Sequence, residues 1–521
     1  MARLKNTRQS TCGVFLLVLI AFLLAPSAAP ATCHTITPGG AGSKSGGDWS
    51  NACAGFSGNC APSSMVRGDA YYVGAGTYTS PTGFLFNAPT SGTSVITIQA
   101  PTSADHCTDT GWNAGTMQGQ AVFAGSGTAT GNAIVDFETS YWTFNGAYNG
   151  CGTNVTKPFA PCRTGYGFKV NNNNGSNQPF NGRYAVVIDY TATGGGSSPV
   201  NNVVVEFVEI AGDADTTGTY CARGYQIESV INGTSLGSST NDELLYSYIH
   251  DTSNGPAYFD GTTNFVADHN WFLRDWSTAS CHSEVGIRAA GSLGTTNFTV
   301  SNNYFENLWS TAALATPSSS LGGVNGLNVY GNVFFCNQQE LGMGAGTVPD
   351  CPGGDGFIFL FNNTFSNVNI YNNTFDGAFG GSNGTVDIAD GVTTTVNTLN
   401  FQNNIFSHQT KSGLFCNSGA TCNALTWSHT SYIDGASKPS GDQDPSSQVS
   451  ASNLYINAST NTAGANDYRL SSDTAVWNPL VWPFNIDPLG VTRTTSRGAF
   501  QVAGLGSGQP NPATSVAASP H

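Results

Sequence analysis

The amino-acid sequence predicts an all-β fold, a solenoid of short strands that stack coil upon coil. Only 9% of the 521 residues are charged, against about 25% in an average domain, and 64 are glycine. Residues that favour strands and tight turns are abundant, whereas helix-forming stretches are scarce. A hydrophobic content of 39%, with 11% aromatic residues, is enough to build a core and argues against disorder. The third observation is a short phrase that recurs along the second half of the chain.

The first 31 residues have the layout of a secretory signal. Arg3, Lys5 and Arg8 form a basic start, residues 14–24 are an apolar run of 11, and small residues follow at 27–31. The run is too short to span a bilayer, although an uncleaved anchor is the alternative. We therefore expect residues 1–31 to be a signal peptide and the mature chain to be secreted or held at the cell surface, with no integral membrane segment.

The charge balance excludes several classes of partner. The leader carries three of the 17 basic residues and none of the 32 acidic ones, which leaves 14 against 32 and a net charge of −18. A surface of this sign repels phosphate backbones and anionic lipids. We expect no nucleic acid as a partner, and we expect a monomer.

The cysteines indicate an oxidising compartment. Twelve of the 13 remain after removal of the leader, an even number that suggests disulfides in an exported chain. None shows the CxxC spacing of a zinc or redox site. Cysteines close in sequence are expected to staple loops, as in Cys53/Cys60, Cys151/Cys162, Cys336/Cys351 and Cys416/Cys422. Cys221/Cys281 would be a longer link, and Cys33/Cys107 is the pair that remains.

The recurring phrase defines the repeat. Each copy follows an alternating strand and places an Asn before an aromatic residue, with successive Asn residues 33, 29, 41 and 31 positions apart. This spacing suits coils whose loops vary in length. Ser247 fits the same frame, and residues 362–365 are an extra copy of unsettled register. The copies are Asp268-His269-Asn270-Trp271-Phe272, Ser301-Asn302-Asn303-Tyr304-Phe305, Gly331-Asn332-Val333-Phe334, Asn372-Asn373-Thr374-Phe375 and Asn403-Asn404-Ile405-Phe406.

A solenoid explains this phrase physically. Successive coils stack their strands as parallel sheets, and inward Val, Ile and Phe side chains fill one continuous core. An Asn at a fixed corner can adopt a left-handed backbone and hydrogen-bond to the Asn residues above and below it.

The chain resembles secreted right-handed parallel β-helix proteins of the pectin-lyase-like superfamily over residues 33–501. The resemblance implies a single-stranded right-handed parallel β-helix with disulfide-stapled loops, but it does not define an activity, because such proteins include lyases, hydrolases, epimerases and binding proteins. A paired Asp-Asp, a Gly-His-Gly and a calcium-pectate-lyase pattern are absent from the sequence. In addition to the repeated phrase, the resemblance to this superfamily rests on the motifs Gly46–Ala52, Arg67–Val73, Gly76–Tyr78, Asp467–Leu470, Asp487–Gly490 and Arg497–Phe500.

The expected organisation is one domain. Residues 32–501 form the β-helix, with 32–130 as the N-terminal cap and first coils and 467–501 as a C-terminal closing segment. Residues 502–521 lack periodic core positions and are expected to be a flexible tail.

Chemistry is expected between Glu206 and Glu284, where 12 of the 32 acidic residues fall within 79 positions. Aligned corners place Asp251, Arg274 and Asn307 on adjacent coils about 4.8 Å apart. Trp276 and Trp309 align in the same way. A charged ladder beside aromatic faces suits a saccharide groove, although an interstrand ion pair and a hydrophobic cluster are the alternatives.

Three further groups extend this candidate site. His282 and Glu284 lie beside Cys281, with Asp260 and Arg288 on neighbouring coils, and Tyr258 is a candidate saccharide contact. A structural role is the alternative for this constellation. Asp213 and Asp215 could bind calcium, the one cofactor considered, although an Asp-x-Asp turn is common.

Three functions follow. The first is an exported enzyme that cleaves a polysaccharide. A hydrolase would use two carboxylates, and a lyase would need a cation and a base. No lysine lies between Lys169 and Lys411, and the acidic surface disfavours polyuronates, so hydrolysis of a neutral glycan is preferred. The second is a glycan-binding or cell-surface module without turnover, and the third is a purely structural solenoid. Carboxylates considered for hydrolysis are Asp251, Asp260, Asp268, Asp275 and Glu284; residues considered for lyase chemistry are His269, Arg274, His282 and Arg288.

Overall fold

The structure is a computed structural model of the whole chain. It describes residues 32–89, 92–125, 133–148, 165–172, 184–188, 199–212, 223–227, 230–231, 234–235, 238–252, 255–275, 285–290, 294–308, 311–316, 323–336, 357–361, 363–377, 386–390, 393–407, 414–416, 419–433, 446–447, 454–457, 467–471, 480–481, 483–494 and 496–501. The expected signal peptide and tail lie outside these residues.

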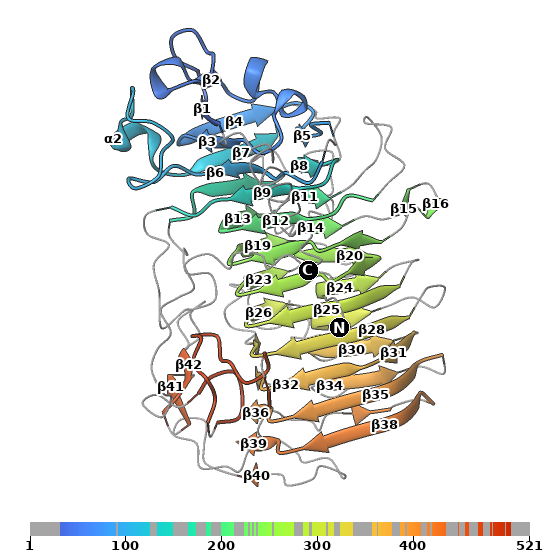
Figure 1. The fold of residues 1–521 in the computed structure, drawn as a ribbon. Coiled ribbons are helices and arrows are strands. Elements are labelled where there is room, and N and C mark those ends of the chain that lie inside the picture. Colours follow the sequence, from blue (N-terminus) through green and yellow to red (C-terminus); the bar gives the residue numbers. More distant parts are fainter. Residues whose placement is uncertain are drawn as a thin grey trace, which may run out of the picture. The chain divides into compact units, whose positions relative to one another are not determined.

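The described strands form three long sheets in which every neighbouring pair is parallel (Figure 1). We call them sheets A, B and C. Sheet A has 16 strands: β2 (Cys53–Ala54), β1 (Cys33–Thr37), β3 (Ala70–Val73), β6 (Ile96–Gln99), β9 (Trp142–Asn145), β12 (Val203–Glu206), β17 (Ser239–Thr240), β18 (Glu243–Leu245), β21 (Thr262–Thr263), β22 (Val266–Asp268), β25 (Thr295–Ser301), β28 (Val324–Tyr330), β31 (Thr364–Ser366), β32 (Val368–Tyr371), β35 (Thr395–Gln402) and β38 (Thr421–Ser428).

Sheets B and C complete the coils. Each turn of the chain runs from sheet C to sheet A, then to sheet B, and back to sheet C. Sheet B has 12 strands: β4 (Gly76–Ser80), β7 (Ala121–Gly125), β10 (Phe168–Asn171), β13 (Val208–Ala211), β19 (Tyr248–Thr252), β23 (Trp271–Asp275), β26 (Tyr304–Leu308), β29 (Val333–Cys336), β33 (Thr374–Gly377), β36 (Ile405–Ser407), β39 (Ser431–Ile433) and β40 (Ser446–Ser447). Sheet C has 10 strands: β5 (Phe84–Phe86), β8 (Ala133–Phe137), β11 (Tyr184–Ile188), β14 (Arg223–Ile227), β20 (Ala257–Asp260), β24 (Val285–Ala290), β27 (Thr311–Thr316), β30 (Ile358–Phe361), β34 (Val386–Asp390) and β37 (Leu414–Phe415).

The remaining described elements are short. Two antiparallel hairpins and four helical turns lie outside the coils. They are β15 (Val230–Ile231) with β16 (Thr234–Ser235), β41 (Tyr455–Asn457) with β42 (Asp467–Leu470), α2 (Ala114–Met117), η1 (Trp49–Asn51), η2 (Gly58–Cys60) and η3 (Pro62–Ser64). No helix in the described part of the chain is long and apolar enough to cross a membrane.

The core is a stack of aromatic and aliphatic side chains from successive coils. The aromatic residue of each repeated phrase points inward from sheet B, and the rings of Phe272, Phe305, Phe334, Phe375 and Phe406 stack with centroids 4.8 to 4.9 Å apart. This distance equals the spacing of parallel strands. The predicted fold class, a parallel β-helix with disulfides in its loops, is therefore confirmed.

The corner between sheets A and B uses two adjacent residues for the two roles that we expected of one Asn. The first residue has a left-handed backbone, as at Asn302 (φ 53°) and Asn372 (φ 53°). The second is buried and forms the ladder: the Asn270 backbone nitrogen donates to Asn303 Oδ1 at 2.9 Å, and Asn303 donates in the same way to Asn332 Oδ1 at 2.8 Å. A single residue performs both roles in a second ladder, where the left-handed residues Asn202, Asn241, Asn264 and Asn297 are joined by hydrogen bonds of 3.0 to 3.3 Å between successive amides. The predicted Asn ladder is thus present at both places, and only the corner between sheets A and B divides the two roles between neighbours.

Two details of the repeat are resolved by the register. Ser247 occupies the ladder position as expected, because its backbone nitrogen donates to Asn270 Oδ1 at 2.9 Å. The extra copy at residues 362–365 leads into β31 of sheet A, where Phe365 pairs with Val324 and Val396. That copy therefore belongs to the start of sheet A and not to the corner between sheets A and B.

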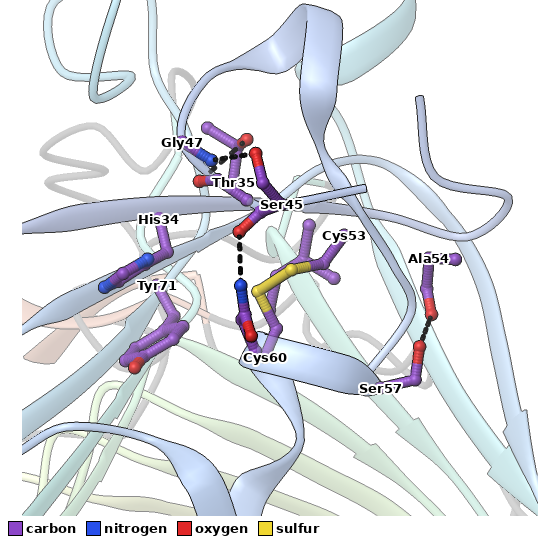
Figure 2. The surroundings of a disulfide bond; sticks show 12 residues. His34, Thr35, Ser45, Gly47, Cys53, Ala54, Ser57, Cys60 and Tyr71 are labelled. Atoms are coloured by element: carbon purple, nitrogen blue, oxygen red, sulfur yellow. Dashed lines mark hydrogen bonds between the residues drawn. A yellow bond between two sulfur atoms is a disulfide. The ribbon is translucent and has the colours of Figure 1, made fainter. Parts of the chain in front are cut away.

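The N-terminal end of the solenoid is closed by a compact cap. The disulfide Cys53–Cys60 joins β2 to η2, and Figure 2 shows it beside the rings of His34 and Tyr71, which stack 4.5 Å apart. Cys33–Cys107 and Cys416–Cys422 are the other disulfides of the described residues. These three pairings are as expected. The cysteines at positions 151, 162, 221, 281 and 351 lie outside the described residues, as does the side chain of Cys336.

The C-terminal segment folds back against the coils. Tyr468 in β42 is buried and its hydroxyl donates to Asp376 Oδ2 of β33 at 2.6 Å. The Phe484 ring lies against Tyr330 and Tyr371 of sheet A, at 5.1 and 5.0 Å. Asp487 accepts three backbone hydrogen bonds that fold the segment on itself.

Candidate functional site

The predicted site residues distribute over the three faces of the solenoid. Asp268 ends β22 in sheet A, and His269 is the corner residue that follows it. Asp251 and Arg274 lie near the ends of β19 and β23 in sheet B. Tyr258, Asp260 and Arg288 belong to sheet C, where Tyr258 pairs in register with Arg288 and Asp260 with Ala290.

Three carboxylates gather on the outer face of sheet A over three coils. Glu206 of β12 pairs with Leu245 of β18, and Leu245 pairs with Asp268 of β22. Glu206 and Asp268 therefore occupy the same row two strands apart, which corresponds to about 9.6 Å between their backbones. Glu243 lies on the strand between them, two positions before Leu245.

The carboxylates of this group differ in their affinity for protons. Burial, followed by the charge of Glu243, raises the pKa of Glu206 to about 7. Burial and the charge of Asp268 also raise the pKa of Glu243. Burial alone would raise the pKa of Asp268, but the positive charge and hydrogen bond of His269 outweigh it and lower that pKa. Near neutral pH Glu206 therefore retains a proton that it can give, whereas Asp268 is ionised.

Asp268 is held by one strand residue and two corner residues from two successive coils. Ser301 Oγ donates to Oδ1 at 2.6 Å, Asn302 Nδ2 donates to Oδ1 at 2.9 Å, and His269 Nδ1 lies against Oδ2. These three contacts occupy three of about four lone-pair positions of a carboxylate. One position is left by these contacts for a water molecule. His269 Nε2 in turn lies 2.9 Å from the Pro488 carbonyl oxygen.

Aromatic rings mark the corner beside this group. Phe207, Tyr246 and His269 follow one another on successive coils, all with left-handed backbones, and their rings stack at 4.9 and 4.8 Å. A left-handed backbone costs a non-glycine residue about 1 to 2 kcal/mol, and ring stacking and partial burial offset that cost. The Tyr246 hydroxyl has a raised pKa because of burial and the charges of Asp268 and Glu206, so it stays protonated as a donor.

A second charged group lies on the outer face of sheet B of the same coils. Lys169 Nζ lies 2.5 Å from Glu209 Oε1, which is also 3.3 Å from His250 Nε2. His250 Nδ1 lies 2.7 Å from Asp251 Oδ2, and Arg274 binds both carboxylate oxygens of Asp251 at 2.7 and 3.0 Å. The five side chains form an unbroken chain of alternating charge.

The partners in this chain neutralise one another. Burial alone would raise the pKa of Glu209, but hydrogen bonds from His250 and Lys169 lower it to about 2. For Asp251, burial is likewise outweighed by His250 and Arg274, so its pKa falls below the usual range. Burial would lower the pKa of His250, and its bonds to Asp251 and Glu209 raise it instead. Neither carboxylate is available as an acid near neutral pH.

The predicted ladder of Asp251, Arg274 and Asn307 is confirmed as a backbone arrangement. All three have left-handed backbones, and the residues on either side of them pair in register on adjacent strands. Asp251 and Arg274 form the interstrand ion pair that was the alternative to a binding role. Asn307 is fully buried and therefore offers no contact to a saccharide.

The described aromatic ladder of sheet B does not form a saccharide platform. The rings of His250, Tyr248 and Trp271 stack at 4.2 and 4.4 Å, so each ring face is covered by the next ring. Trp271 is 3% exposed, and its Nε1 donates to the buried Glu306 at 2.8 Å. Rings aligned on coils 4.8 Å apart present edges and not faces to solvent.

Several predicted residues cannot be placed. Asp213, Asp215, Trp276, His282, Glu284 and Trp309 lie outside the described residues, as do the side chains of Asp260, Asp275 and Arg288. Within the described ranges, no group of three or more His, Cys, Asp or Glu side chains is arranged to hold a metal ion.

Sequence reasoning missed Glu206, Glu243 and Glu209 as individual residues. Each occupies an outward position of an alternating strand, next to inward Val or Leu residues. A charged residue at the outward position of adjacent coils was therefore a usable signal. The sequence does not show which of these carboxylates has a cationic neighbour.

No family model matches the chain, and no curated protein matches it by sequence. Solved structures of similar fold include pectate lyase Pel9A, with a TM-score of 0.42 and 14% identity over 91% of this chain and 98% of that one. The PL6 family alginate lyase AlyGC has a TM-score of 0.39 and 12% identity over 80% of this chain and 57% of that one. The Agl-KA catalytic domain has a TM-score of 0.25 and 15% identity, and the match covers 73% of this chain and 60% of that one.

Proposed function

We propose that this protein is an exported polysaccharide-active enzyme that hydrolyses a neutral glycan on the outer face of sheet A. In this proposal Glu206 protonates the leaving-group oxygen and Asp268 activates the attacking water. The observation that carries it is the opposite shift of two pKa values in one row: the pKa of Glu206 is raised to about 7, and that of Asp268 is lowered. Paired carboxylates with separated pKa values are the requirement of glycoside hydrolysis.

The separation of the two residues supports an inverting reaction. A backbone spacing of about 9.6 Å lies near the range of about 6.5 to 9.5 Å between carboxylates that leaves room for a water, and well above the 5 to 5.5 Å of retaining enzymes. We therefore expect the product to have the inverted anomeric configuration.

The surface next to the pair supports a neutral substrate. The outward row of sheet A that contains Glu243, two positions before the row of Asp268, is uncharged from Val266 onward. Its amides form a half-exposed ladder: Asn369 Nδ2 donates to Asn328 Oδ1 at 2.9 Å, and Asn400 Nδ2 donates to Asn369 Oδ1 at 3.0 Å. Amides of this kind donate to and accept from sugar hydroxyls. The carboxylates beside this row would repel a polyuronate.

The three disulfides of the described residues support export, because such bonds persist in oxidising compartments. Calcium at Asp213 and Asp215 stays a prediction.

The test is turnover by the purified mature protein on neutral and uronic polysaccharides, with and without calcium. Reducing ends without the ultraviolet absorbance of an unsaturated product would support hydrolysis, whereas both signals together would indicate a lyase. Nuclear magnetic resonance of the first product would report its anomeric configuration.

A glycan-binding module without turnover is the second candidate. It is favoured by the amide ladder, which needs no catalytic pair to bind hydroxyls, and by the three contacts that already engage Asp268. Retardation in glycan affinity gels without any product would support this function.

A further inference from the structure

The two ends of sheet A differ in a way that bears on assembly. At the N-terminal end, the outermost strand β2 is two residues long, and η1, η2 and the disulfide Cys53–Cys60 close the solenoid. At the C-terminal end, the outermost described strand is β38, which spans eight residues. Among the described strands, β38 pairs with β35 alone (Figure 1).

The edge strand β38 is open to solvent. Thr421, Asn423, Ala424, Leu425 and Thr426 are all exposed. Unpaired N–H and C=O groups along a strand of this length are a template for a further strand. Edge strands are usually protected by charge or proline, but the sequence of β38, Thr-Cys-Asn-Ala-Leu-Thr-Trp-Ser, contains neither.

The core is also incomplete at this end. Leu425 pairs in register with Leu399, which pairs with Val368, and both of these side chains are fully buried. Leu425 occupies the next inward position of the same core row, yet it is 40% exposed. An inward position that faces solvent indicates that a further layer covers it in the functional state.

We propose that β38 is the interface of a tail-to-tail dimer, in which it pairs antiparallel with β38 of a second copy of this chain. A strand that pairs antiparallel with itself about a two-fold axis is self-complementary, as closed dimers require. The pairing adds backbone hydrogen bonds along the exposed part of β38, residues 421–426, and covers Leu425 of each copy.

Charge favours this partner. The chain has a formal net charge of −15, so most approaches of two copies are repulsive. The eight residues of β38 carry no charge, so pairing there brings no like charges into contact. Head-to-tail stacking is disfavoured because the edge at the other end is two residues long and lies in a disulfide-linked cap. This inference departs from the monomer expected from the sequence.

The test is sedimentation equilibrium of the purified chain over a wide range of concentrations. We expect the wild-type chain to reach twice the mass of one copy, and Leu425→Lys to raise the dissociation constant at least tenfold. Thr426→Lys should act in the same direction, because Thr426 is exposed and its replacement leaves the core row intact. The matched control is Val66→Lys, since Val66 is 54% exposed near the N-terminal end.

Circular dichroism and thermal melting of each variant separate loss of pairing from loss of folding. A wild-type chain that stays monomeric at all concentrations would overturn the proposal. A dimer that both β38 variants leave intact would overturn it as well.

Discussion

Glu206 and Glu209 are separated by two residues, and their pKa values are about 7 and about 2. Glu206 faces outward from sheet A, and Glu209 faces outward from sheet B on the other side of the corner at Phe207. Both side chains are half-buried. Glu209 accepts hydrogen bonds from Lys169, His250 and Gln120, whereas the charge that most affects Glu206 is the like charge of Glu243.

The comparison shows which of the two carboxylates can transfer a proton near neutral pH. On sheet B, Glu209 and Asp251 each have cationic partners, so the chain from Lys169 to Arg274 stabilises the stacked coils and neither carboxylate takes up a proton near pH 7. On sheet A the charge that acts on Glu206 is the like charge of Glu243, which is unfavourable for folding and useful for proton transfer. Exchanging one carboxylate for an amide on each face therefore tests the comparison directly.

The largest expected effect is on activity. Glu206→Gln removes the proton donor, so kcat should fall about 10²- to 10⁴-fold, while the free energy of unfolding at pH 7 should rise, because the neutral amide avoids the cost of burying an ionised carboxylate beside Glu243. Reducing-end assays on the substrate found in the polysaccharide panel measure the first quantity, and urea denaturation measures the second. Glu209→Gln is the matched control and should keep kcat within about threefold. Equal losses in both variants would contradict the assignment of Glu206.

The next effect is on stability. Glu209→Gln removes the negative charge that Lys169 and His250 share in a half-buried site and leaves them only a neutral amide oxygen as acceptor, so the free energy of unfolding should fall by about 1 to 3 kcal/mol. The variant Glu206→Gln serves here as the control. A Glu209→Gln chain as stable as wild type would show that the charged chain on sheet B contributes nothing to folding.

The two faces should also respond to pH in opposite ways. The folded-state pKa of Glu206 lies above its ordinary value of 4.5, so the folded state binds the extra proton and stability from this group falls as pH rises from 4.5 to about 7. The folded-state pKa of Glu209 lies below 4.5, so stability from this group is lost as pH falls from 4.5 to about 2. Unfolding free energies from pH 2 to 8 should lose the first slope in Glu206→Gln and the second in Glu209→Gln. Slopes that both variants retain would contradict these shifts.

The smallest effect concerns Glu243. Glu243→Gln removes the negative charge that helps to raise the pKa of Glu206, so the alkaline limb of the pH–rate profile should move to lower pH by a fraction of a unit. The maximal rate should change little, because Glu243 is a positioning residue in this proposal. A profile that stays in place, with activity intact, would mean that burial alone determines the proton affinity of Glu206.

The sequence predicted the repeat well because its physical causes are local. Inward Phe residues such as Phe305 and ladder residues such as Asn303 recur with every coil, and stacking at the strand spacing leaves little freedom in where they lie. The same alignment correctly placed Asp251 next to Arg274. We also predicted Asp268 and His269 as catalytic candidates from the sequence. The sequence did not reveal that His269 lies against the Pro488 carbonyl oxygen, 219 residues away in the chain.

The sequence by itself thus determined the parallel β-helix, its corners, and the disulfides Cys53–Cys60 and Cys416–Cys422, because each follows from a pattern that repeats with the coil or from cysteines 7 and 6 positions apart. Cys33–Cys107 joins cysteines 74 positions apart and was predicted only as the pair that remained. Only the tertiary structure decided which carboxylates are neutralised and which are not. Proton affinity depends on the charges and burial around a side chain, and for Glu206 and Glu209 these come from other coils, up to 89 residues away in sequence.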